Sequence, residues 1–197
     1  MSNHEEKLAR IGKLGDETTL LRRAMIGELS EKIINSAALI SGVLGSGGKL
    51  LIGGNGGSAA DASHFAGEMV VRLTSERNRQ ALPAIALGMD PSVMSAAAND
   101  YGYEKAMARQ VEALGAKGDL LFLISTSGNS PNLVEAANVA RDRGILATGL
   151  LGGKGGKLAS LVDHPLIVPH DSTQRIQEEH IFIIHLLVEL VEGDLFG

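Results

Sequence analysis

Apolar residues along the chain follow two spacings, and each predicts a different kind of element. Over residues 18–44 they recur every three or four positions, which is typical of an amphipathic helix. Five later runs are short and almost continuously apolar, as in strands buried on both faces of a parallel sheet: KLLIGG, LPAIALG, DLLFLIS, LATGLLG and HPLIVP. Helical segments separate and follow them, over residues 58–73, 91–98, 103–114, 130–143 and 173–192. The alternation predicts a doubly wound α/β domain behind a long N-terminal helix.

The first and last predicted helices carry wide apolar stripes. In the last helix the stripe consists of Ile181, Ile184, Leu187, Val188 and Val191. A small sheet covers only part of this surface, so we expect subunits to pack against the remainder. We therefore expect a single domain over residues 1–197, with residues 1–45 used in oligomerisation and residues 46–197 forming the α/β core that binds the ligand.

Composition restricts the classes of function. Of the 197 residues, 44% are hydrophobic and 21% are charged, and the formal net charge of −5 disfavours general binding to polyanions. The chain has no cysteine, so disulfides and thiolate catalysis are excluded. Its first ten residues are polar, and no uncharged apolar run reaches the roughly 18–20 residues of a membrane span. We expect a cytoplasmic protein with no nucleic-acid partner and no membrane partner.

A cluster of uncharged polar residues follows the third apolar run, in the stretch LISTSGNSP. Open α/β sheets bind ligands at the carboxyl ends of their strands, and Pro131 marks the start of a helix whose free N–H groups favour an anion. Four hydroxyl groups gather there, from Ser125, Thr126, Ser127 and Ser130. A helix cap needs only one hydroxyl, which here is that of Ser130. We therefore prefer a phosphate site over simple capping.

A second glycine-rich junction, LLIGGNGGS, joins the first apolar run to the next helix. Its glycines lack the G-x-G-x-x-G spacing of a dinucleotide site, and no clear ribose-binding acid follows, which disfavours NAD. Glycine lets the backbone approach a ligand closely. We expect this turn to contact a polyol through the backbone of Gly56 and Gly57 and the side chains of Asn55 and Ser58.

His64 and Glu68 are four residues apart in a predicted helix, so they lie on one face about one turn apart. That spacing lets both bind one metal ion, or lets Glu68 act as a base beside a polar partner. The alternative is an ordinary exposed pair on a solvated face. The surrounding Ala, Phe, Gly, Met and Val residues indicate burial, and a buried carboxylate needs a partner, so we favour a functional pair.

Five motifs, in order along the chain, resemble one family of enzymes. GNGGS, DASHFAGE, ANDYGYE, STSGNSPN and RIQEEHIFIIH together are similar to the phosphoheptose isomerases, which are sugar-isomerase (SIS) domain proteins. The resemblance covers residues 49–197, and the first 45 residues match in pattern only. It implies a flavodoxin-like five-stranded parallel sheet and a homotetramer with active sites at subunit interfaces. It also implies an aldose–ketose isomerase that converts sedoheptulose 7-phosphate into D-glycero-D-manno-heptose 7-phosphate through an enediol, for the biosynthesis of lipopolysaccharide or a related glycoconjugate.

The resemblance also assigns roles to individual residues. It implies that Glu68 is the general base and His185 the general acid. His64, Glu68, Gln177 and His185 match the positions that bind zinc in members that carry it, which implies one zinc ion per subunit. The implied substrate contacts are Asn55, Gly56, Gly57, Ser58, Glu68, Asn99, Asp100, Ser125, Thr126, Ser127, Ser130 and Gln177. Gln177 and His185 are separated by about 12 Å of helix, so both reach one ion only if the early turn is irregular or different subunits contribute.

Alternatives remain open at two levels. His185 lies in an apolar stretch and, without the resemblance, is better interpreted as a core histidine. Three residues on the same helix compete with it: Glu178, Glu179 and His180. Some relatives carry Asp where this chain has Gln174. For the whole chain, the alternatives are an isomerase of another sugar phosphate and a non-catalytic SIS regulator that binds a replication-initiator protein; that regulator lacks counterparts of Glu68 and His185, which favours the enzyme.

Overall fold

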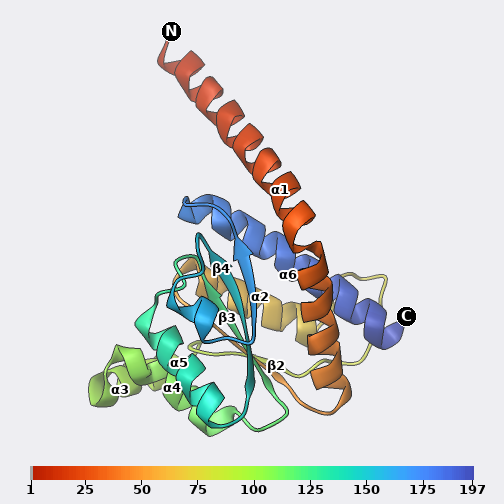
Figure 1. Ribbon diagram of the computed structural model, residues 1–197, viewed down its shortest axis with the longest axis vertical. Helices are drawn as coiled ribbons and strands as arrows, with labels where there is room; N and C mark the ends of the chain where they lie inside the picture. The colour runs from red at the N-terminus through yellow and green to blue at the C-terminus, as the bar shows by residue number, and fades with distance from the viewer. Residues whose placement is uncertain (1) are drawn as a thin grey trace.

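The computed structural model describes residues 2–197, in which a five-stranded sheet lies between two layers of helices (Figure 1). The strands are β1 (Leu50–Gly54), β2 (Ala84–Ala86), β3 (Leu120–Ser125), β4 (Leu146–Gly152) and β5 (His164–Val168). The helices are α1 (Asn3–Gly45), α2 (Gly57–Val70), α3 (Pro91–Tyr101), α4 (Tyr103–Leu114), α5 (Pro131–Asp142), the short 3-10 helix η1 (Lys157–Ser160) and α6 (Thr173–Phe196). All neighbouring strands are parallel, in the order β2-β1-β3-β4-β5. This flavodoxin-like order confirms the predicted fold class.

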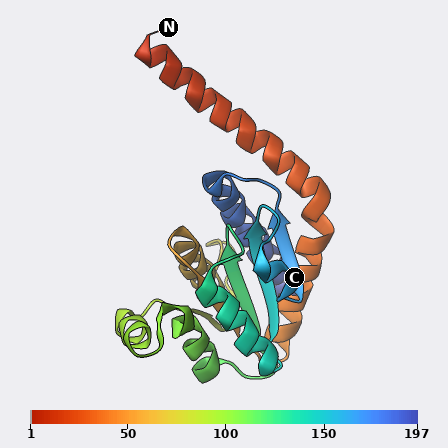
Figure 2. The same ribbon diagram turned by 60° about the vertical axis from the view of Figure 1, so that its left-hand side comes forward.

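Apolar side chains fill the space on both faces of the sheet. On one face lie α1, α2 and α6, where the rings of Phe65 and Phe122 meet edge to face at a centroid distance of 5.1 Å. On the other face lie α4 and α5, around Met107 and Leu133 (Figure 2). β1 and β3 are buried along their whole length, as their unbroken apolar sequence predicts. Because helices cover both faces of the sheet, the loops at the carboxyl ends of the strands are the segments that remain available to bind a ligand.

Helix α1 begins at Asn3, well before the start near residue 18 that the apolar spacing predicts. Ser2 and Glu5 form a capping box, in which each side chain accepts a hydrogen bond from the other residue's N–H. The first buried side chain of α1 is that of Leu21, so no buried contact holds the preceding segment. The cap stabilises the helix start in this segment. This leading part projects away from the domain (Figures 1 and 2), and its use in oligomerisation stays a prediction. None of the described helices, α1 included, combines the length and apolarity needed to cross a membrane.

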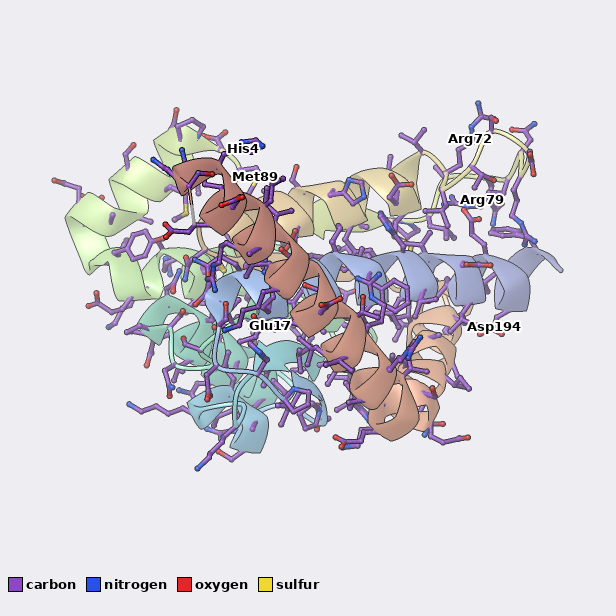
Figure 3. All side chains as sticks on the ribbon, turned by 90° about the horizontal axis from the view of Figure 1, so that it is seen from above. His4, Glu17, Arg72, Arg79, Met89 and Asp194 are labelled. Carbon is purple, nitrogen blue, oxygen red and sulfur yellow. The ribbon has the colours of Figure 1, made fainter. Side chains whose placement is uncertain are left out.

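Helix α2 ends at Val70, three residues earlier than predicted, where an arginine from the following loop caps it. The Arg79 guanidinium donates to the backbone carbonyls of Glu68 and Met69, each at 2.8 Å. Its Nε donates to the Glu192 carboxylate at 2.7 Å, and both side chains are buried. Figure 3 shows Arg79 on the loop after α2, beside the C-terminal part of α6. This contact fixes the backbone at one of the candidate catalytic residues.

Candidate active site

The loops after β1 and β3 open at the same edge of the sheet, because Gly54 and Ile124 are paired at the ends of these strands. Asn55 joins the two loops. Its amide and that of Asn132, at the start of α5, exchange two hydrogen bonds of 2.8 Å. The Tyr103 hydroxyl donates to the Asn55 Oδ1 at 2.9 Å. The predicted substrate residue Asn55 thus uses most of its amide to hold the loops together and keeps one N–H for a ligand.

The predicted hydroxyl cluster forms a tight loop at the start of α5. The buried Ser125 Oγ accepts a hydrogen bond from the Gly128 N–H at 3.1 Å, and the Ser127 Oγ accepts one from the Asn129 N–H at 3.2 Å. Ser130 occupies the N-cap position, but its side chain accepts no hydrogen bond from the helix. Its Oγ instead lies 3.5 Å from the Ser125 Oγ. The hydrogen bond of a simple cap is therefore not made, which leaves this hydroxyl available to a ligand.

A glycine-rich loop after β4 packs directly on the hydroxyl loop, and sequence analysis assigned it no role. Gly156 has a φ of +54°, and a side chain there would meet the Ser127 carbonyl oxygen at 2.5 Å. The Lys157 N–H donates to the Asn129 Oδ1 at 3.0 Å. A side chain on the last residue of β4 would meet the Thr126 carbonyl oxygen at 2.5 Å. The signal in the sequence for this packing was the repeated glycines of GGKGGK, since glycine permits one loop to approach the other closely.

The turn from β1 into α2 brings another backbone segment to this edge. Gly56 has a φ of +55°, which favours glycine, and it is the N-cap of the helix. The Ser58 N–H donates to the Asn55 carbonyl at 3.0 Å, and the Ser58 side chain is buried. A side chain on Gly57 would overlap the amide of Gln177 from α6. The predicted contacts from Asn55 to Ser58 and the predicted contact from Gln177 therefore belong to one region.

The predicted base and acid come together between α2 and α6. The Nε2 atoms of His64 and His185 lie 2.9 Å apart, with their rings edge to face. The Glu68 Oε1 lies 3.6 Å from the His64 Nε2, and the Glu68 Oε2 is buried without a hydrogen-bond partner in the described chain. The His64 side chain is 42% exposed, and His185 is exposed rather than part of the core. A solvent-accessible imidazole pair with an adjacent carboxylate can exchange protons with a bound ligand.

Gln177 lies two helical turns before His185, so within one chain it is not part of the histidine pair. A residue that sequence analysis missed is Asp61 on α2, whose Oδ2 is buried without a hydrogen-bond partner in the described chain. Burial raises the pKa of the Asp61 carboxyl, and the hydrogen bond from Gln177 and the proximity of His64 offset part of this rise. Asp61 stands three residues before His64, on the same side of α2, and this spacing was the signal that could have found it.

The three competing residues on α6 have structural partners. Glu178 accepts a hydrogen bond from the Thr18 hydroxyl at 3.1 Å. Glu179 accepts two hydrogen bonds from the Arg22 guanidinium, at 3.0 and 3.1 Å. His180 is fully buried, with its Nε2 3.2 Å from the carbonyl oxygen of a β4 residue. These contacts attach α6 to α1 and to the sheet, which leaves His185 as the exposed histidine of this helix.

The buried His180 predicts how stability depends on pH. Burial lowers its pKa to about 4 in the folded protein, from 6.5. Between these values the unfolded chain binds a proton that the folded chain does not bind, so the free energy of unfolding should fall by about 3 kcal/mol as the pH drops from 6.5 to 4. Urea unfolding of the wild type and His180→Gln across this range measures the effect. The variant should lose part of the pH dependence, whereas the exposed control His164→Gln should keep it; equal slopes in all three proteins would contradict the assignment.

Two predicted substrate residues lie elsewhere within the single chain. Asn99 and Asp100 are exposed on α3, a helix with no buried residue, and their side chains hydrogen-bond to each other at 2.8 Å. Asp100 lines a cavity of about 570 Å³ between α3 and α4, and none of the other predicted site residues lines that cavity. Gln174, where some relatives carry Asp, is exposed and accepts a hydrogen bond from the Ser172 hydroxyl at 3.0 Å. The isolated chain therefore does not bring these three residues to the histidine pair.

The donor types of the histidine pair and Glu68 fit zinc, which prefers imidazole and carboxylate ligands. Glu68 also offers an oxygen without a partner. Two nitrogens bound to one tetrahedral zinc ion stand about 3.3 Å apart, so the 2.9 Å between His64 and His185 would widen slightly. Within residues 2–197 no three His, Asp or Glu side chains are already arranged around a metal position. The group therefore holds suitable ligands that are not yet in coordination geometry.

Comparisons with known proteins show the family to which the chain belongs. The SIS domain family model matches residues 15–152. The sequence is 49% identical over 193 residues to the phosphoheptose isomerase of Trichlorobacter lovleyi, covering 98% of this chain and 92% of that protein, and 51% identical over 173 residues to that of Geobacter sulfurreducens, covering 88% and 90%. Two solved phosphoheptose isomerases are similar in structure. The one from Neisseria gonorrhoeae has a TM-score of 0.88 and 40% sequence identity, and the match covers 94% of this chain and 98% of that chain. The one from Francisella tularensis has a TM-score of 0.91 and 34% sequence identity, and the match covers 95% of this chain and 98% of that chain. The chain thus belongs to the phosphoheptose isomerase family of SIS-domain proteins and is an isomerase.

Proposed function

We propose that the protein interconverts sedoheptulose 7-phosphate and D-glycero-D-manno-heptose 7-phosphate, in the biosynthesis of heptose for lipopolysaccharide or a related glycoconjugate. The observation that carries the proposal is the group of Glu68, His64 and His185 on α2 and α6. Helix α2 begins at the sheet edge that also carries the hydroxyl loop. One chain therefore offers proton-transfer groups and a neutral, hydroxyl-rich loop, which are the two features that a sugar-phosphate isomerase needs. Relatives at about half identity bear the name phosphoheptose isomerase.

The reaction moves a proton from C1 to C2 of the ketose, with a second proton passing between the two oxygens. Glu68 is the base for the carbon-bound proton, because its Oε2 has no other partner to satisfy. His185 transfers the proton that passes between the two substrate oxygens. At 2.9 Å, the His64 and His185 nitrogens share one hydrogen bond, so one ring donates while the other accepts. This pair can hold a proton close to the substrate and release it again.

We also propose that His64, Glu68 and His185 bind one zinc ion per subunit, which when bound would polarise the substrate oxygens. Gln177 completes such a site only from another subunit, since in its own chain it lies about 12 Å along α6 from His185. A nitrogen that binds a metal cannot carry a proton, so the His185 Nε2 transfers protons only when it is free of metal. Metal content measured by mass spectrometry should be near one zinc per wild-type subunit and strongly reduced in His64→Ala; equal content in both would contradict the site.

The proposed phosphate loop makes a prediction that separates ligand binding from capping. Ser130→Ala should raise KM by about tenfold or more, because a hydrogen bond to a charged group is lost. Its free energy of unfolding should change by less than about 0.5 kcal/mol, because the Ser130 side chain caps no N–H. Asp90 is the control, since its carboxylate does cap α3, and Asp90→Ala should cost about 1 kcal/mol. A destabilised Ser130→Ala with unchanged KM would reverse the interpretation.

The proposed assembly is a homotetramer with active sites at subunit interfaces. It is supported by the projecting part of α1, which has no buried residue before Leu21, and by α3, which has none at all. An adjacent subunit would then be the source of the contacts that Asn99 and Asp100 do not make within their own chain. Light scattering of the purified protein gives the subunit number, and a stable monomer with full activity would contradict the proposal.

Proton NMR of the protein with sedoheptulose 7-phosphate in D₂O tests the proposed reaction. Formation of an aldoheptose phosphate with deuterium at C2 is the expected result, because the proton delivered there comes from a group that exchanges with solvent. Absence of product from folded protein would contradict the substrate assignment. Hexose and pentose phosphates should be assayed in parallel, since conversion of one of these would identify another sugar phosphate as the substrate.

A further inference from the structure

The hydroxyl of Tyr103 makes a hydrogen bond that packing does not explain. Tyr103 is the first residue of α4, directly after Gly102, whose φ of +87° lets the chain turn from α3 into α4. It is 53% exposed, so water competes for the hydroxyl and the hydrogen bond contributes little to folding. Helix α4 is attached to the sheet by other residues, among them the buried Met107 and Val111. The Tyr103 hydroxyl is therefore better explained by the side chain that it holds than by the stability of α4.

That side chain is the amide of Asn55, in the turn after β1. The Asn55 Oδ1 accepts a hydrogen bond from the Tyr103 hydroxyl at 2.9 Å and another from the Asn132 Nδ2 at 2.8 Å. An amide oxygen has two lone pairs, so both are occupied. The Asn55 Nδ2 donates one of its two N–H groups to the Asn132 Oδ1 at 2.8 Å. Within residues 2–197, one N–H group therefore remains of the hydrogen-bonding capacity of this amide.

The three side chains belong to three different elements, which is why the contact from Tyr103 matters. Asn132, which is 1% exposed, lies on α5, and two parallel hydrogen bonds join its amide to that of Asn55. Such a pair acts as a hinge, because the two amide planes can fold about the line that joins the hydrogen bonds. The Tyr103 hydroxyl reaches the other lone pair of the Asn55 oxygen from α4 and limits this motion. Donation to the oxygen also polarises the amide, which makes the remaining N–H group a stronger donor.

We propose that Tyr103 is a positioning residue, which holds the Asn55 amide so that its free N–H group donates to an oxygen of the bound sugar phosphate. Tyr103 acts through Asn55 and touches no reacting atom. The inference rests on the proposed function, because Asn55 donates to a sugar phosphate only if this site binds one.

The first test is Tyr103→Phe, which keeps the ring and removes the hydroxyl. We expect KM for sedoheptulose 7-phosphate to rise about 3–10-fold, the effect of weakening one hydrogen bond between neutral groups. The value of kcat should stay within about twofold, because Asn55 binds the substrate and the transition state alike. The midpoint of thermal unfolding should not change, because the Asn55 Oδ1 still accepts from Asn132. An unchanged KM, or a loss of kcat together with thermal stability, would overturn the proposal.

The matched control is Tyr101→Phe, which removes the hydroxyl of a tyrosine that is 51% exposed and lies two residues earlier. The centroid of the Tyr101 ring lies 4.9 Å from the Arg109 Cζ, and phenylalanine keeps this contact. Its KM, kcat and unfolding midpoint should all equal those of the wild type. If Tyr101→Phe raised KM as much as Tyr103→Phe, loss of either hydroxyl would have the same effect, and the specific role of the contact with Asn55 would be overturned.

A double-mutant cycle tests whether Tyr103 acts through Asn55. Asn55→Ala should raise KM by more than Tyr103→Phe does, because the N–H group itself is lost. In Y103F/N55A the loss of the hydroxyl should add less than about twofold, because no amide is left to position. If the two single effects multiplied instead, Tyr103 would contact the sugar phosphate by itself, and the positioning role would be overturned.

A third measurement depends neither on turnover nor on Asn55→Ala. The side-chain amide signals of Asn55 are assigned in a ¹H–¹⁵N spectrum of the labelled protein through their correlation with its Cβ. We expect them to move in Tyr103→Phe and to stay in place in Tyr101→Phe, because only the first variant loses the donor to the amide oxygen. If the wild type fails to isomerise sedoheptulose 7-phosphate, the proposed function fails, but this spectrum still tests the contact. Identical Asn55 signals in the wild type and Tyr103→Phe would overturn the role of Tyr103.

Discussion

Glu68→Gln is expected to lower kcat by about 10²–10⁴-fold, the range by which a positioned general base accelerates a reaction. Glutamine matches glutamate in size but cannot take up the carbon-bound proton. Two features of the structure indicate that the expected loss of kcat comes from the chemical step and not from unfolding of the protein. The Glu68 Oε2 has no partner that the substitution would remove, and its Oε1 lies 3.6 Å from the His64 Nε2, beyond a normal hydrogen bond. The rate of aldoheptose phosphate formation measures the effect.

The control for this experiment is Glu31→Gln, which removes an exposed carboxylate from α1. It should turn over at the wild-type rate. Calorimetry should show that Glu68→Gln still binds sedoheptulose 7-phosphate within a few-fold of the wild type, because the hydroxyl loop is unchanged. Wild-type turnover in Glu68→Gln would remove Glu68 from the mechanism. If Glu68→Gln lost both substrate binding and thermal stability, Glu68 would instead have a structural role in the site.

Arg79→Met is expected to lower the free energy of unfolding by about 3–5 kcal/mol, the usual effect of removing one partner of a buried ion pair. The Arg79 side chain is 1% exposed and that of Glu192 is 4% exposed, so the carboxylate left behind would be buried. It would keep only two weaker contacts, with the Arg77 Nε at 3.9 Å and the Leu73 N–H at 3.3 Å. The substitution also removes the hydrogen bonds to the carbonyls of Glu68 and Met69 at the end of α2. Denaturant unfolding monitored by circular dichroism measures the change.

The double variant R79M/E192L separates the two contributions of Arg79. Replacing both charges by apolar side chains is often nearly neutral, so most of the electrostatic loss should be recovered. The carbonyls at the end of α2 still lack their donor, so recovery should be incomplete. Arg141→Met, which removes a side chain that is 61% exposed, should stay within about 0.5 kcal/mol of the wild type. If Arg79→Met also changed the free energy of unfolding by less than about 0.5 kcal/mol, the buried pair of Arg79 and Glu192 would not be important for stability.

Local sequence patterns predicted the elements because their causes are local. Continuous apolar runs indicated strands buried on both faces, and the five predicted runs correspond to β1 to β5. Helix ends were less well predicted. The start of α1 depends on the capping box of Ser2 and Glu5, and the end of α2 coincides with a cap by Arg79, which belongs to a later loop. An apolar period contains no information about such contacts.

The sequence by itself determined the α/β alternation, the hydroxyl loop at a helix start and the pairing of His64 with Glu68, because each depends on spacings of a few residues. Only the tertiary structure distinguishes the surroundings of His180 from those of His185. The two lie five residues apart in the same apolar helix, and the way α6 packs on the sheet turns one into the core and the other toward His64. The hydrogen bonds between Asn55 and Asn132 and the packing of the glycine-rich loop on the hydroxyl loop were likewise decided by the fold. The residues in such contacts are far apart in the sequence, and their side chains meet only when the helices and loops pack together.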